Sequence, residues 1–201
     1  MKRPNILWIM SDQHNVNTLG CYGNPTAQTT HIDALAQSGI LFENTYVTSP
    51  LCVPSRASIW SSRYPHRNGV MLNDEERNIG LDDRIDTIGD LANAAGYQCG
   101  YIGKWHIGRE HTPQHGFNAA WWTQLRGSYE QALEEEQSFA FAPTGSKTQL
   151  GVRLAQRGQV PFEQAHDTVV TSKTIEFIQA ASKREEPFLA VCSMRAPHDP
   201  Y

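Results

Sequence analysis

Residues 87–106 read Thr-Ile-Gly-Asp-Leu-Ala-Asn-Ala-Ala-Gly-Tyr-Gln-Cys-Gly-Tyr-Ile-Gly-Lys-Trp-His. Apolar residues recur at helical spacing over 87–95, and a glycine closes that helix. Residues 98–102 then form an apolar strand, so Lys104 and His106 follow its carboxyl end. A helix that leads into a buried strand, with polar residues beyond it, is the repeating unit of a parallel α/β sheet.

The same unit recurs along the chain. Strands are expected at 5–10, 40–42 and 188–192, and helices at 30–38 and 164–181. Asp12 follows the first of these strands and His198 follows the last. Open α/β sheets bind ligands outside the carboxyl ends of their strands, so these two residues are expected to converge with Lys104 and His106. We predict an α/β fold with a mostly parallel sheet flanked by helices on both faces.

The pattern blurs between residues 118 and 161, where glycines and prolines are scattered. We predict an insertion of short helices and loops there. Its acidic run at 134–136 is interpreted as a solvated helix face rather than a metal site. The paired tryptophans at 121–122 are interpreted as core or as a subunit interface, which leaves a homo-oligomer possible.

Composition limits the function further. The chain has 201 residues, 39% of them hydrophobic and 19% charged, which is enough for one sizeable core. Its net charge of −4 provides no basic field for nucleic acid, and no apolar run is long enough to cross a bilayer. The four cysteines show no metal or disulfide spacing, and the first strand is too short for the core of a signal peptide. A soluble, cytoplasmic protein with a small substrate is expected.

The run Cys-Val-Pro-Ser-Arg at 52–56 carries the chemistry. Pro54 suits the first turn of a helix, where its missing N–H costs least, so Cys52 is predicted at a helix N-terminus. Free N–H groups and the helix dipole favour a bound oxyanion there, and Arg56 can add a fork of donors. The alternative is that Cys52 is a small buried side chain and Arg56 a surface charge.

The surrounding sequence resembles the sulfatase signature C-x-P-S-R-x-x-x-x-x-x-R-Y-P-H-R-x-G-V. It is matched by Cys52, Pro54, Ser55, Arg56, Arg63, Tyr64, Pro65, His66, Arg67, Gly69 and Val70. Further similarity lies at 5–13, 19–23, 31–36, 42–46, 96–106 and 196–200. The resemblance implies an alkaline-phosphatase-like fold. Because sulfatases are normally much longer, we expect residues 1–201 to be the N-terminal portion of the catalytic domain, without the C-terminal subdomain and inactive alone.

The resemblance also implies roles for individual residues. In the sulfatase family the signature cysteine, here Cys52, is oxidised to formylglycine, whose hydrate attacks sulfur and later expels sulfate. Arg56 would stabilise the hydrate, and Lys104 would contact the hydrate and the sulfate. His106 would orient the attacking hydroxyl. His198 would bind sulfate and protonate the leaving oxygen, a task for which histidine is suited because an unperturbed imidazole titrates near neutral pH.

A divalent metal is also expected. Asp12 is a hard carboxylate at a strand end, and the family resemblance makes Ca²⁺ the first choice, with Mg²⁺ or Mn²⁺ as alternatives. Residue 52, as formylglycine, would be a further ligand. Gln13 stands where the commonest family pattern has a second aspartate, and its amide oxygen can still coordinate. The two carboxylates at 82–83, in a polar turn, could mimic a metal pair, but Asp12 has the better position at a strand end.

Three functions are therefore open. The first is hydrolysis of a sulfate monoester, on an aryl, sugar or choline sulfate, after maturation by a formylglycine-generating enzyme. The second is hydrolysis of a phosphonate monoester or phosphodiester, because the Asp-Gln pair also resembles that branch of the superfamily. The third is a non-catalytic binding protein that keeps Cys52 unmodified. The remaining cysteines are expected in the core, and the histidines outside the motifs are expected to be solvated or structural.

Overall fold

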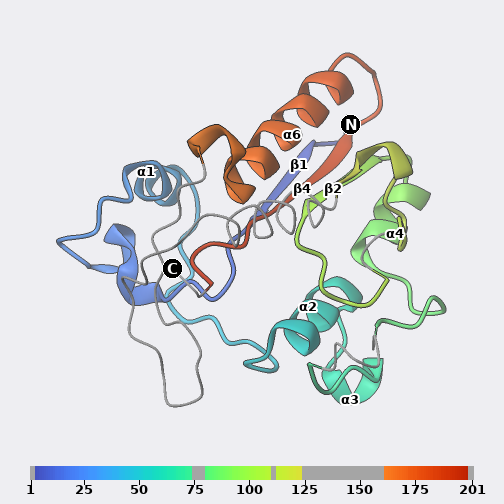
Figure 1. Cartoon of the computed structure of the whole chain (residues 1–201), viewed down its shortest axis with the longest axis horizontal. Coiled ribbons are helices and arrows are strands. Elements are labelled where there is room, and N and C mark those ends of the chain that lie inside the picture. The colour runs from blue at the N-terminus through green and yellow to red at the C-terminus, as the bar shows by residue number, and fades with distance from the viewer. Residues whose placement is uncertain (1–2, 74–79, 110–111, 124–160, 199–201) are drawn as a thin grey trace, which may run out of the picture.

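One parallel sheet organises the chain. The computed structural model describes residues 3–73, 80–109, 112–123 and 161–198. Its sheet has the order β1-β4-β2-β3, formed by β1 (Ile6–Met10), β4 (Phe188–Ser193), β2 (Gln98–Gly103) and β3 (Trp122–Thr123). All described pairings are parallel. The strand that is last in the sequence therefore lies between β1 and β2 (Figure 1).

The helices largely follow the predicted ranges. They are α1 (Thr30–Ser38), α2 (Cys52–Ser61), α3 (Pro65–Asn68), α4 (Ile88–Ala94) and α6 (His166–Ala181). Short 3-10 helices lie at Val16–Thr18, Gly20–Tyr22, Ala119–Trp121 and Phe162–Gln164. Within the described ranges, no helix is both long and apolar enough to cross a membrane. The predicted α/β architecture is confirmed.

Helices cover both faces of the sheet because successive strand residues point to opposite sides. On one face, Tyr101 and Val191 pack with α2 and α4. On the other face, Ile102 and Cys192 pack with α6. Figure 1 shows α6 on one side of the strands and α2 with α4 on the other. The expectation of helices on both faces is confirmed.

Trp60 of α2 is central to the first of these cores. Its side chain is completely buried. Ring centroids of four aromatic residues lie 5.4–6.1 Å away, belonging to Trp8, Tyr101, Phe117 and Trp105. This aromatic packing fixes α2 on the sheet, and with it the position of Cys52 at the first turn.

The paired tryptophans divide between the two cores. The Trp122 ring lies 5.4 Å from that of Tyr101, whereas the Trp121 ring lies 5.2 Å from that of Phe177. Both therefore pack as core residues, one of the two interpretations made from the sequence. The rest of the predicted insertion, including the acidic run at 134–136, lies outside the described residues.

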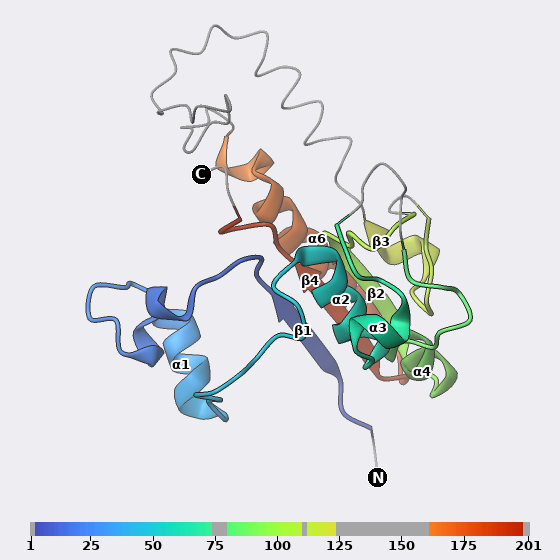
Figure 2. The same ribbon diagram turned by 90° about the horizontal axis from the view of Figure 1, so that it is seen from below.

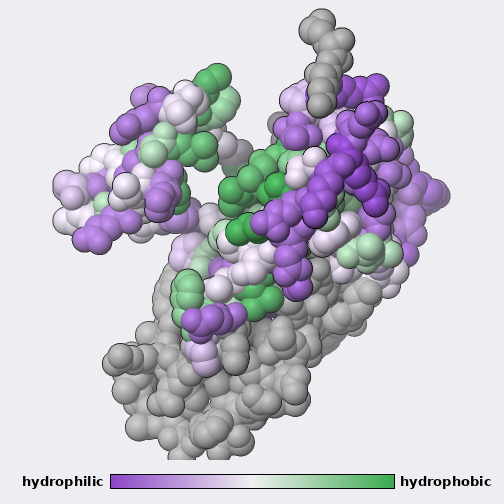
Figure 3. Space-filling model, turned by 90° about the horizontal axis from the view of Figure 1, so that it is seen from above, coloured by the Kyte–Doolittle hydropathy of each residue, from purple (hydrophilic) through white to green (hydrophobic). Residues whose placement is uncertain are grey.

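The strand predicted at residues 40–42 is wrong. This segment has no strand conformation, and Ile40 and Phe42 are 82% and 69% exposed. A strand needs a hydrogen-bonded neighbour, but the Phe42 carbonyl instead accepts a bond of 2.8 Å from the Tyr22 hydroxyl. Figure 2 shows α1 standing apart from the sheet on the side of β1, and Figure 3 shows apolar surface on both sides of that separation.

The cysteines are all free thiols. Cys99 and Cys192 are buried, as predicted, and burial raises the pKa of Cys99 to about 11 and also raises that of Cys192. Cys21 and Cys52 are only half-buried. The expectation of core packing therefore holds for Cys99 and Cys192 but is wrong for Cys21, whose place in a short surface 3-10 helix leaves it partly exposed.

Candidate active site

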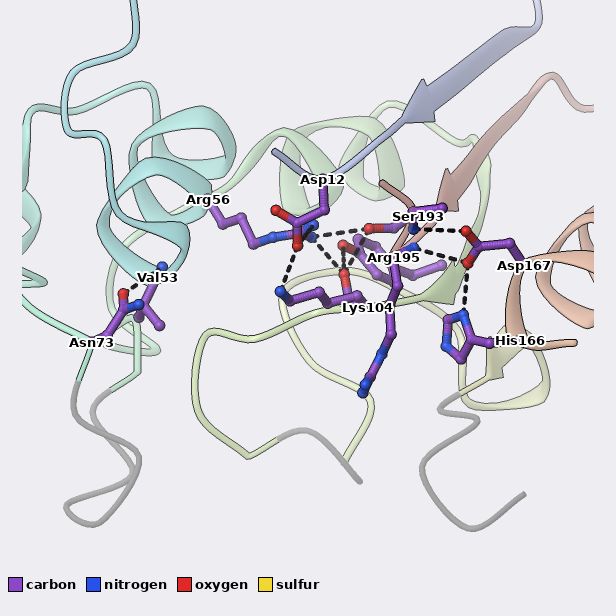
Figure 4. Close-up of polar contacts among 11 residues, drawn as sticks. Asp12, Val53, Arg56, Asn73, Lys104, His166, Asp167, Ser193 and Arg195 are labelled. Carbon is purple, nitrogen blue, oxygen red and sulfur yellow. Dashed lines mark hydrogen bonds and ion pairs between the residues drawn. The ribbon is translucent and has the colours of Figure 1, made fainter. Parts of the chain in front are cut away.

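Cys52 is the first residue of α2, as predicted from the sequence. Leu51 before it is extended and offers no side-chain cap. The cap comes instead from Asn73, whose Oδ1 accepts the Val53 N–H at 3.0 Å (Figure 4). Pro54 in the same turn has no N–H to satisfy. The half-buried thiol therefore lies at the positive end of a helix held by a residue outside every motif.

Arg56 points back from α2 to the ends of the strands. Only 3% of this residue is exposed, so the alternative that it is a surface charge is wrong. Its Nη1 donates to the Lys104 carbonyl at 2.6 Å and to Ser193 Oγ at 2.9 Å. Its Nη2 donates to Asp12 Oδ2 at 3.4 Å. One guanidinium thus joins α2 to residues at the ends of β1, β2 and β4 (Figure 4).

The carbonyl of Lys104 is a second junction. Besides Arg56, it accepts bonds of 2.7 Å from the Tyr101 hydroxyl and from Ser193 Oγ. Gly103 allows this close approach, because its φ is +103° and a Cβ there would lie 2.0 Å from the Ser193 carbonyl oxygen. The ends of β2 and β4 therefore contact each other closely at Gly103, Lys104 and Ser193.

Asp12 pairs with two positively charged side chains. Its side chain is 9% exposed and forms ion pairs with Arg56 and with Lys104 Nζ. Burial alone would raise the pKa of Asp12, but the hydrogen bond from Lys104 and the charges of Arg56, Lys104 and His198 hold it below its ordinary value. Asp12 is therefore ionised at neutral pH. Two positive side chains against one carboxylate leave a net positive charge that suits an anion.

Three possible metal ligands meet at the same place. A carboxylate oxygen of Asp12, Sγ of Cys52 and a ring nitrogen of His198 all lie within 4.8 Å of one another. The ionised Asp12 fits a hard divalent cation. The structure thus brings Asp12, Cys52 and His198 together, with Arg56 and Lys104 on Asp12.

The other predicted site residues lie beside this group in sequence. Gln13 follows Asp12 and is exposed, with a φ of 59°. His106 is half-buried two residues beyond Lys104, with a φ of 60°. Their expected roles stay predictions. The weaker metal candidates, Asp82 and Asp83, form ion pairs with Arg84 and Arg109 respectively. Neither belongs to the group formed by Asp12, Cys52 and His198.

The sequence similarity to known proteins now identifies the family. The profile named Sulfatase matches residues 4–201. The chain belongs to the sulfatase family. It spans between 31% and 40% of the length of the first curated sulfatases that it matches. Family membership therefore applies to this part of the sulfatase domain, and the activity of a whole protein is a matter for proposal.

Three matches describe how similar this sulfatase chain is to known sequences and structures. It is 33% identical, over 98% of its length and 31% of the other's, to the N-acetylglucosamine-6-O-sulfatase of Bacteroides thetaiotaomicron. It superposes with a TM-score of 0.70 and 30% identity on BT4656, solved with its substrate D-glucosamine-2-N,6-O-disulfate, covering 98% of this chain and 35% of that one. The phosphonate monoester hydrolase of Agrobacterium radiobacter shares the fold, with a TM-score of 0.71, 23% identity and coverage of 98% and 42%.

Proposed function

We propose that the protein containing this chain hydrolyses sulfate monoesters, with residues 1–201 as the N-terminal portion of its catalytic domain. The observation that carries the proposal is the meeting of Cys52 with Asp12 and His198 within 4.8 Å. Membership of the sulfatase family supports it. The net positive charge left by Arg56 and Lys104 around Asp12 supports an anionic substrate.

Each residue has a task in this proposal. The N-terminus of α2 and Lys104 face the sulfate oxygens with positive charge, which stabilises the charge that grows on them as the ester bond breaks. Arg56 holds the Lys104 backbone and the nucleophile's helix in one place. His198, the third member of the cluster, protonates the departing oxygen. His106 orients the attacking hydroxyl.

Two groups complete the chemistry. Oxidation of Cys52 to formylglycine, by a formylglycine-generating enzyme, would supply one hydroxyl for attack and a second for release of sulfate. A divalent cation, Ca²⁺ first and Mg²⁺ or Mn²⁺ as alternatives, would supply positive charge to the sulfate oxygens. Asp12, Gln13 and residue 52 would hold that cation, together with ligands from outside this chain.

The substrate we propose is a sulfated sugar. The support is the identity of 33% to an N-acetylglucosamine-6-O-sulfatase and the likeness to a structure solved with D-glucosamine-2-N,6-O-disulfate. Aryl and choline sulfates are the other esters to be screened. A screen of sulfated sugars would identify which sugar carries the sulfate.

The test compares an aryl sulfate and an aryl phosphonate monoester as substrates of the metal-loaded protein, produced together with a formylglycine-generating enzyme. We expect sulfate turnover that disappears in Cys52→Ala and persists in Cys21→Ala, a matched control at the other half-buried cysteine. Mass spectrometry of the peptide around Cys52 should show the aldehyde. Turnover that survives in Cys52→Ala would overturn the mechanism.

A second candidate is a phosphonate monoester or phosphodiester hydrolase. It is favoured by Gln13 in place of a second aspartate, which removes one negative charge from the metal site. A clear preference for the phosphonate would establish it. An unmodified Cys52 in protein from its native source, with no turnover of either ester, would instead favour the non-catalytic binding protein.

A further inference from the structure

The loop that carries His198 is held by a carboxylate from another element. Asp167 lies in the first turn of α6. Its Oδ1 accepts the Arg195 N–H and its Oδ2 accepts the Ala196 N–H, each at 2.8 Å (Figure 4). Both oxygens of one carboxylate thus bind consecutive backbone N–H groups, which fixes the direction of the chain between β4 and His198.

Asp167 is itself fixed. The ring Nδ1 of His166 lies 2.7 Å from Asp167 Oδ1 and must carry the proton of that bond, because an ionised carboxylate only accepts. Burial alone would raise the pKa of Asp167, but the bonds from His166, Arg195 and Ala196 lower it. The side chains of His166 and Asp167 are 10% and 24% exposed. This carboxylate is therefore ionised, shielded and bound on both oxygens.

The held loop connects directly to the candidate active site. The Ala196 carbonyl accepts the Asp12 N–H at 3.3 Å, and the Arg195 carbonyl accepts the His198 N–H at 2.9 Å. The residues bound by Asp167 thus contact the backbone of two of the three clustered groups. Movement of this loop would displace His198 relative to Asp12.

We propose that Asp167 is a positioning residue that holds His198 in place for protonation of the leaving group. Its catalytic consequence rests on the proposed function. Asp167→Asn keeps the size of the side chain, but its amide NH₂ would face the backbone N–H of Arg195 or Ala196, and two donors cannot bond to each other. Only one of the two bonds could survive, and the loop would shift.

The first experiment measures turnover of two sulfate esters by the complete, metal-loaded, formylglycine-bearing protein. For an alkyl sulfate, whose leaving oxygen needs a proton, Asp167→Asn should lower kcat about 10- to 100-fold with little change in KM. For an aryl sulfate with an acidic phenol, the loss should be several-fold smaller. A merely structural role would lower both rates equally.

A double-mutant cycle links the loss to His198. In the His198→Ala background, Asp167→Asn should cause no further loss of kcat. Asp33→Asn is the matched control, because Asp33 likewise accepts a backbone N–H, that of Cys21 at 2.7 Å, on the separate α1 region. It should leave kcat for both esters unchanged. Additive losses in the cycle, or equal losses for the two esters, would overturn the proposal.

A readout without turnover separates this proposal from the proposed function. The imidazole Cε1–H resonance of His198, assigned by its disappearance in His198→Ala, should shift in Asp167→Asn and stay in place in Asp33→Asn. A wild-type protein that hydrolyses no sulfate ester would refute the proposed function alone, and the resonance would then decide the positioning role. A His198 resonance that is the same in Asp167→Asn and wild type refutes that role.

Discussion

Replacement of Arg56 by methionine should destabilise the protein strongly. Methionine has a similar length, so the main loss is the guanidinium and its bonds rather than volume. The two short bonds, to the Lys104 carbonyl at 2.6 Å and to Ser193 Oγ at 2.9 Å, are charge-assisted, and such bonds contribute about 1.5–3 kcal/mol each. The longer contact with Asp12, at 3.4 Å, contributes less because Lys104 still pairs with that carboxylate.

The expected loss of folding free energy is smaller than the upper limit obtained by adding the contributions of the two short bonds. The Lys104 carbonyl keeps two other donors, Tyr101 and Ser193, so it is not left unsatisfied. Loss of one partner from a buried charge network generally costs about 3–5 kcal/mol. We therefore expect the free energy of unfolding of Arg56→Met to fall by about 3–5 kcal/mol.

Urea unfolding of the metal-free protein, with the unmodified cysteine, measures this loss without the contribution of the cofactor. Arg84→Met is the matched control, because the Arg84 side chain is 88% exposed and its ion pair with Asp82 lies in solvent. It should not change the urea midpoint measurably. Equal midpoints for Arg56→Met and Arg84→Met would refute the claim that the guanidinium supports the site.

Three further changes test the surroundings of the site. Gly103→Ala should lower the free energy of unfolding, measured by thermal denaturation, by about 2–4 kcal/mol, because the new Cβ would collide with the Ser193 carbonyl. Its control is Gly23→Ala, at a φ of +95° with open space around it, which should lower the free energy of unfolding by only about 1–2 kcal/mol. Trp60→Ala should cost about 3–5 kcal/mol in urea unfolding, and a smaller loss than that of Gly23→Ala would contradict its central place in the core. The pKa of Asp12 is lower in the folded protein than its unfolded value near 4, so ionised Asp12 stabilises the fold fully above that pH. This stabilisation is lost as the pH falls through the folded-state pKa. In metal-free Asp12→Asn, the free energy of unfolding should therefore depend less on pH below about pH 4. Calorimetric titration of the same variant should show weaker Ca²⁺ binding, and unchanged binding would place the metal elsewhere.

Much of the fold follows from local patterns. The strand at residues 98–102 and the helices at 30–38 and 164–181 were predictable because their apolar periodicity matches the geometry of one element. The run at 40–42 was apolar too, but an apolar run becomes a strand only where another strand is available to pair with it. That condition depends on the whole sheet and cannot be read from three residues.

The candidate site divides in the same way. Cys52 and Arg56 were identifiable because proline and a helix pattern mark a helix N-terminus locally. Asn73 and Ser193 were missed because each is an ordinary polar residue in sequence and gains its role from a contact 20 or 137 residues away. Asp167 offered one signal, a carboxylate in the first turn of a predicted helix, which is also where aspartate is commonly found for helix stability alone.

The position of β4 in the middle of the described sheet also determines when the site can form during synthesis. Strands β1 and β2 are not paired with each other, so neither can form its hydrogen bonds to β4, which lies between them, until β4 has been synthesised. Ser193 at the end of β4 leaves the ribosome about 140 residues after Cys52, which at 5–20 residues per second is a delay of about 7–28 s. Until then the bonds of Arg56 and Lys104 to Ser193 cannot exist. An enzyme that modifies Cys52 in an extended chain therefore has a period of seconds before β4 arrives and closes the site.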